Sequence, residues 1–247
     1  MRKECSLALI LVLGWATSCW GQTHQTSAPL SGVPQTAFTY FEQVEDRRFN
    51  EFLHRLRPSK LSPELKERVL KMLPKADLVS PSGGQQAKLR ALGPILQYHE
   101  RDSAVELKVL RVPTATTAFL AGAAVLITEP ALEVLSAEEL QAVVAHELGH
   151  EYFWGEFELA RQHEQYSKLQ ELELRCDGIA VITLSQLGLN PESLISGVTK
   201  LNRYNGHKEG ATAAGRYLLL EERVKFIRSM IEMARAGSKV APTLACK

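Results

Sequence analysis

Apolar residues recur at helical spacing in two stretches near the start of the chain. The first runs from Phe38 through Phe41, Phe49 and Leu53 to Leu56 and stops at Pro58. The second begins at Ser62-Pro63, because proline suits the first turn of a helix, and ends at Pro74. With a third helix over residues 85–98, interrupted at Gly93-Pro94, these predict an N-terminal helical region over residues 36–100. The pattern leaves open whether this region covers the rest of the chain or is a removable pro-segment.

The next stretch changes from helical to strand periodicity. Residues 105–112 alternate apolar and polar side chains and end at Pro113, and residues 123–128 form a second run after the small residues of 114–122. These runs predict a small sheet. An edge of such a sheet can hold an extended peptide through backbone hydrogen bonds. The alternative is that both strands serve only as core.

The C-terminal half returns to helical spacing. Ser136 and Glu139 form a capping box, and the helix that follows is predicted to continue through Phe157. A long helix from Leu169 ends at Gly188, another starts at Asn190-Pro191, and the last spans residues 216–234. The predicted fold is therefore α+β and mostly helical, with a main domain over residues 101–236 and a flexible tail over 237–247.

The capped helix carries His146-Glu147-Leu148-Gly149-His150, an HExxH motif. Residues four apart lie on one face of a helix, so His146 and His150 can present two imidazole nitrogens to one ion, with Glu147 beside them. The alternative is that the two histidines are only polar neighbours. The capping box and the apolar face favour a genuine zinc-binding helix.

A catalytic zinc site needs three protein ligands and one open position, so a third donor is required. Glu173 and Asp177 lie four apart on the long helix and share a face. Glu173 would complete a two-histidine, one-glutamate site, and Asp177 would accept a hydrogen bond from a ligand imidazole. Glu171 is the competing ligand, but it points about 200° away from Glu173. The alternative is that these carboxylates face water.

These residues together resemble the zinc metallopeptidase family of the CAAX prenyl protease and the bacterial heat-shock protease HtpX, in its soluble exported branch. The similarity spans about residues 104–230 and includes Thr117-Ala118-Phe119, which is similar to the Asn-Ala-Phe of the family's substrate-binding edge. The resemblance implies a zincin-type domain whose sheet packs on the HExxH helix. It implies zinc on His146, His150 and Glu173, with Glu147 catalytic and Asp177 behind the ligands.

The chain departs from the family pattern at several positions. Thr117 replaces the usual Asn, Cys176 the usual Ala, and Gly178 a common basic residue. Cys176 is expected to be a small buried side chain, with a thiolate ligand as the alternative. The family's downstream His-Pro element is not evident. The candidates for a positive group that stabilises the transition state are His207, Arg216 and Arg223.

Composition and the amino terminus bear on partners and location. A net charge of +1 over 247 residues gives no excess of basic residues that would indicate nucleic-acid binding. Arg2 and Lys3 precede a short apolar run, which predicts a signal peptide over residues 1–21, a Thr/Ser/Pro-rich linker over 22–35 and no transmembrane segment in the mature chain. A lipid anchor at Cys19 is the alternative to simple cleavage. Cys176 and Cys246 are either a disulfide pair or two free thiols.

The sequence thus predicts a zinc-dependent endopeptidase with one Zn²⁺ per chain. It would hydrolyse peptide bonds by metal-activated water with Glu147 as general base, and its substrate would be a protein or peptide. The export signal predicts a periplasmic or cell-envelope location, with a lipoprotein as one form, and a role in protein turnover or quality control. The alternative is a non-catalytic, client-binding protein on a metallopeptidase scaffold.

Overall fold

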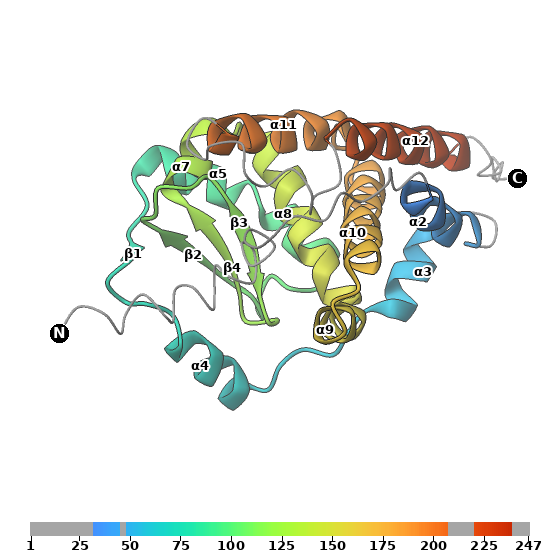
Figure 1. Cartoon of the computed structure of the whole chain (residues 1–247). Coiled ribbons are helices and arrows are strands. Elements are labelled where there is room, and N and C mark those ends of the chain that lie inside the picture. The colour runs from blue at the N-terminus through green and yellow to red at the C-terminus, as the bar shows by residue number, and fades with distance from the viewer. Residues whose placement is uncertain (1–31, 45–47, 207–219, 239–247) are drawn as a thin grey trace, which may run out of the picture.

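The computed structural model describes residues 32–44, 48–206 and 220–238. A four-stranded sheet has the order β1-β2-β4-β3, with β2 and β4 parallel and the two outer strands antiparallel to their neighbours (Figure 1). The strands are β1 (Leu78–Val79), β2 (Glu106–Leu110), β3 (Thr117–Leu120) and β4 (Ala124–Thr128). Neither β1 nor β3 is predicted as a strand by the periodicity, since β1 is very short and β3 lies in the stretch of small residues.

Helices account for most of the described chain, and the predicted α+β class is confirmed. Along the chain they are α2 (Val33–Glu42), α3 (Phe49–Leu56), α4 (Pro63–Lys71), α5 (Gly83–Arg90), α6 (Gly93–Tyr98), α7 (Glu129–Val134), α8 (Ala137–Tyr152), α9 (Trp154–Gln162), α10 (Tyr166–Gln186), α11 (Glu192–Gly206) and α12 (Leu220–Ser238). In Figure 1, α8 lies between the sheet and α10, and α11 and α12 cross above them. The HExxH helix is thus the central element of the domain.

Alternation along β3 assigns its side chains to two sides of the sheet. Phe119 belongs to the main core cluster with the apolar residues of α8, whereas Ala118 joins Leu126 and Leu73 in a second cluster. Thr117 is two residues from Phe119 and therefore shares its side, which faces α8. One polar side chain of the edge strand is in this way directed at the HExxH helix.

The expected boundaries of α8 are correct at one end only. The capping box of Ser136 and Glu139 forms, and the helix is buried along most of its length. It ends at Tyr152 because Phe153 leaves helical geometry, with φ −117° and ψ 14°, so the predicted continuation through Phe157 is wrong. The next long helix, α10, ends at Gln186, two residues before the predicted cap Gly188, whose φ of +68° favours glycine.

Two glycines allow helices to approach closely around the site. A Cβ on Gly149 would lie 2.9 Å from the Cα of Cys176, so this position of the HExxH motif lets α10 pack directly on α8. A Cβ on Gly178 would lie 2.3 Å from Cε2 of Phe41, a fully buried side chain of α2. A side chain at position 178 would overlap with α2, so the packing of α2 on α10 requires glycine there.

The N-terminal helices belong to the core of the domain. Phe41 of α2 and Leu53 of α3 are fully buried in the same apolar cluster as the residues of α8 and α10. The single helical run expected from Phe38 to Leu56 is two helices, α2 and α3, separated by residues 43–48, of which 45–47 lie outside the described residues. The predicted linker ends too late, since α2 begins at Val33 with Pro34 in its first turn.

His99 is a buried histidine away from the HExxH motif, and it should make the fold sensitive to acid. Its Nδ1 lies 2.7 Å from the Tyr152 hydroxyl and its Nε2 lies 3.0 Å from that of Thr183. Burial lowers its pKa from 6.5 to about 3, helped by the charges of Arg57 and Arg101. Between those two values the unfolded chain binds a proton that the folded chain does not. The free energy of unfolding should therefore fall by about 1.4 kcal/mol per pH unit as the pH drops below 6.5.

The control for this acid effect is His99→Gln, which keeps a polar side chain but has no proton to gain. Urea unfolding of both chains between pH 7 and pH 4 should show a shallower loss of stability in the variant. Equal slopes in the two chains would contradict the assignment.

Several predictions concern residues outside the described part of the chain. These are the signal peptide over residues 1–21, the lipid anchor at Cys19, the partner thiol Cys246, and the candidates His207 and Arg216. Residues 237 and 238 of the predicted tail are the last residues of α12. In the described ranges, no helix is both long and apolar enough to cross a membrane.

Candidate metal centre

Three side chains from α8 and α10 converge on one point. His146 and His150, one turn apart on α8, have ring centroids 5.1 Å from each other. One ligand atom from each histidine and a carboxylate oxygen of Glu173 on α10 all lie within 4.8 Å of one another. Among the described residues, this is the group of histidine, cysteine and acidic side chains placed to hold a metal ion.

The donor atoms are spaced almost as a zinc site requires, with one printed distance inside the tetrahedral range and one slightly longer. Tetrahedral zinc with ligand distances of 2.0–2.2 Å needs donor atoms separated by about 3.3–3.6 Å. Nε2 of His146 lies 3.4 Å from Glu173 Oε2, and Nε2 of His150 lies 3.9 Å from Glu173 Oε1. The Glu173 side chain is 41% exposed and that of His146 only 7%. The cluster therefore opens to solvent on the Glu173 side, where a fourth position would be available.

Asp177 orients His146 from behind the cluster. The imidazole donates from Nδ1 to Oδ1 of this fully buried carboxylate over 2.8 Å, which leaves Nε2 facing Glu173. Arg223 on α12 donates to both oxygens of Asp177 over 2.7 Å. Burial alone would raise the pKa of Asp177, but Arg223 and His146 lower it to about 2. The carboxylate is thus ionised, fixes the ring orientation of His146 and keeps a proton on Nδ1, so that Nε2 is the nitrogen available to a metal.

The clustered side chains strongly influence one another's charge. Burial would lower the pKa of His146, but Asp177 and Glu173 outweigh it and raise the pKa to about 10. Burial would raise the pKa of Glu173, but the two histidines and Arg223 lower it to about 2. For His150, burial prevails and lowers the pKa. Negative charge on Glu173 and Asp177 thus prepares the centre for a cation.

Glu147 lies beside the ligands and is held by the sheet. Its Oε1 accepts a hydrogen bond of 2.7 Å from the hydroxyl of Thr117 at the start of β3, and both side chains are buried. Sequence reasoning placed Thr117 on a possible substrate-binding edge, as a departure from the family's Asn, and missed this contact. The inward-facing position of Thr117 on a strand could have suggested it, had β3 been recognised.

Arg223 lies in the centre, but on its inner side. Its Nη2 is 3.4 Å from Nδ1 of His146, whereas the opposite nitrogen, Nε2, is the one that faces Glu173. The guanidinium therefore lies on the Nδ1 side of the imidazole, where it is also bonded to Asp177. The assignment of Arg223 as a positive group that stabilises the transition state stays a prediction.

Glu171 and Cys176, the other candidates for a metal ligand, lie outside the three-residue cluster. The Glu171 carboxylate pairs with Arg175 and lies 3.2 Å from Lys168, and Arg175 in turn stacks 4.0 Å over the ring of Tyr40. Glu171 therefore takes part in docking α2 on α10. Cys176 is fully buried against Gly149, and burial raises its thiol pKa, so this thiol is outside the ligand cluster.

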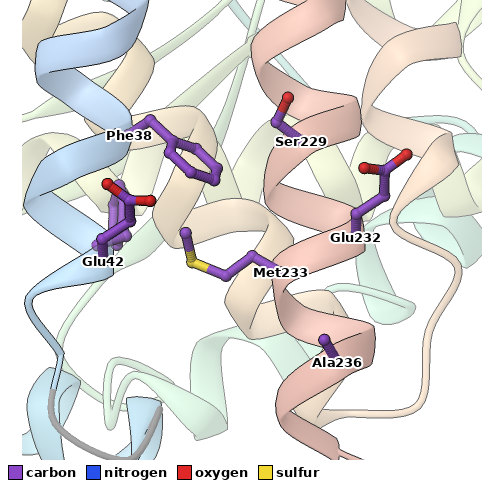
Figure 2. Close-up of a pocket in the computed structure, with 7 residues that line it drawn as sticks. Phe38, Glu42, Ser229, Glu232, Met233 and Ala236 are labelled. Atoms are coloured by element: carbon purple, nitrogen blue, oxygen red, sulfur yellow. The ribbon is translucent and has the colours of Figure 1, made fainter.

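A separate surface hollow of about 460 Å³ lies between α2 and α12 (Figure 2). Its walls include Phe38, Met233 and the carboxylates Glu42 and Glu232. The one hydroxyl in its lining, that of Ser229, donates to the backbone carbonyl of Lys225. The hollow's two carboxylates are not part of the described three-residue cluster that could hold a metal ion.

Comparison with known proteins finds a family match that includes the HExxH helix. Residues 86–153 match the model of peptidase family M48. The matched segment contains the whole of β2, β3, β4 and α8 and stops before α10, which carries Glu173 and Asp177. A search of curated proteins finds no match to the chain.

Proposed function

We propose that this chain, a member of peptidase family M48, is a zinc-dependent endopeptidase with Glu147 as its general base. The observation that carries the proposal is the convergence of His146, His150 and Glu173 within 4.8 Å, beside a buried glutamate of the same helix. This donor set, two imidazoles and one carboxylate with an exposed side, is typical of catalytic rather than structural zinc. A structural site would have four protein ligands.

The protein residues would divide the chemistry as follows. His146, His150 and Glu173 would hold one Zn²⁺, which when bound supplies a Lewis acid and a water of lowered pKa. Glu147 would take the proton of that water on its carboxylate and pass it to the departing amine. Asp177 and Arg223 would keep His146 in the tautomer whose Nε2 is free.

The proposed substrate is an extended segment of a protein or peptide. β3 pairs with β4 on one side and is the outer strand at that end of the sheet. An extended chain added to the side of β3 that pairs with no described strand would run past Thr117 and hence past Glu147, to which Thr117 is bonded. This arrangement favours unfolded or flexible polypeptides over compact ones. With the predicted export signal, it supports a role in turnover or quality control of cell-envelope or periplasmic proteins.

The proposal is tested by metal content and cleavage together. The purified full chain should contain about one zinc per chain, cleave an unfolded protein such as casein, lose activity with a chelator and regain it when zinc is added. The competing function is client binding without catalysis on the same scaffold. Substoichiometric zinc, together with no cleavage above background whether or not a chelator is present, would favour this competitor.

A further inference from the structure

Thr117 offers the only side-chain hydrogen bond to Glu147 within the described part of the chain. The bond is 2.7 Å long, and the exposed fractions of the two residues are 5% and 9%. A hydroxyl donor to a carboxylate of this length and burial is a strong, charge-assisted bond. It joins the edge strand β3 to the HExxH helix at the residue proposed to move the proton.

We propose that Thr117 is a positioning residue, whose hydroxyl fixes the rotation of the Glu147 carboxylate so that Oε2 remains available for the proton. This inference rests on the proposed peptidase function. Thr117 binds Oε1, and no described side chain binds Oε2. A carboxylate that is anchored at one oxygen presents the other in a defined direction, and orientation of a reacting group is a large part of catalysis.

The fold holds the Thr117 hydroxyl firmly in place. Thr117 pairs with Ile127 of the central strand β4, and its backbone carbonyl accepts a hydrogen bond of 3.1 Å from the hydroxyl of Thr116. Phe119, two residues along, is packed in the core on the same side of the sheet. The donor thus belongs to a strand held by pairing and packing. A movement of β3 would displace the hydroxyl that is bonded to Glu147.

The activity test uses two substitutions at Thr117. Thr117→Val keeps the branched shape and removes the hydroxyl, so kcat should fall about 10- to 100-fold while KM changes less than about threefold. Thr117→Ser restores a hydroxyl and should recover most of the lost turnover. Zinc content should stay at the wild-type value in both variants, because Thr117 contacts no ligand of the cluster.

The matched control is Thr183→Val. Thr183 is also a buried threonine whose hydroxyl bonds a side chain, that of His99, but it lies away from the metal cluster. It should lose stability without a comparable loss of kcat. If Thr117→Val retained wild-type kcat, if Thr117→Ser were as impaired as Thr117→Val, or if only KM rose, the positioning role would be wrong.

A second readout does not depend on activity. Thr117→Val should lower the thermal midpoint of the zinc-loaded full chain by about 3–10 °C when Glu147 is present, and by less than about 2 °C in a Glu147→Ala background. The non-additivity measures the Thr117–Glu147 bond directly. A wild type that contains zinc but cleaves nothing would overturn the proposed function while the thermal cycle still reported the bond. Additive thermal shifts would show that the bond itself is absent.

Discussion

Glu147→Gln should yield a chain that folds, keeps one zinc and has lost nearly all turnover. The amide has the shape of the carboxylate, and its carbonyl oxygen can still accept the Thr117 hydroxyl. It cannot take a proton from water at neutral pH, and proton transfer by a positioned group contributes about 10²- to 10⁴-fold to rate. Steady-state cleavage of an unfolded protein, with zinc analysis on the same samples, measures both effects.

Glu151→Gln is the matched control for this variant. Glu151 is one turn beyond Glu147 on the same helix, is nearly as buried, and accepts a hydrogen bond of 2.8 Å from Arg101. Because Arg101 also donates to the carbonyl of Pro58, this change should weaken the attachment of the N-terminal segment and lower stability. Turnover per folded molecule should remain. If Glu147→Gln kept cleavage within a few-fold of wild type, Glu147 would not be the general base.

The sequence predicted the parts of the centre that depend on local geometry. His146 and His150 share a face because four residues make about one helical turn, and the same spacing places Glu173 and Asp177 together. The capping box at Ser136 fixed the start of the helix that carries the motif. Each of these inferences needs only residues close in sequence and a known helical period.

The missed features depend on contacts between distant segments. The bond from Thr117 to Glu147 needs the register of β3 against β4 and the packing of the sheet on α8, which no local pattern encodes. The end of α8 at Tyr152 was missed because the aromatic residues Phe153, Trp154 and Phe157 continue the apolar pattern beyond it. The need for glycine at position 178 depends on Phe41, from a helix more than a hundred residues earlier, whose ring occupies the space of a side chain there.

Glu173→Ala should remove zinc from the chain. This prediction distinguishes Glu173 from Glu171 as the third metal ligand. Glu173 supplies the only carboxylate of the described three-residue cluster and lies 3.4 Å from Nε2 of His146. Two imidazoles alone leave an ion with half of its tetrahedral ligand set. Zinc should therefore be lost on dialysis, and added zinc should no longer raise the thermal midpoint of the variant as it does that of the wild type.

Glu171→Ala is the control that the helix itself provides. Glu171 is two residues earlier, and its carboxylate pairs with Arg175 instead of facing the histidines. The variant should lose stability as α2 loosens from α10 but should bind zinc as the wild type does. Asp177→Ala should lie between the two, with zinc affinity about 10- to 100-fold weaker, because His146 loses the acceptor that orients it. Competition titration against a chromophoric chelator ranks the three. If Glu171→Ala lost zinc while Glu173→Ala kept it, the ligand-bearing face of α10 would be the opposite one, and the metal centre built on Glu173 and Asp177 would be wrong.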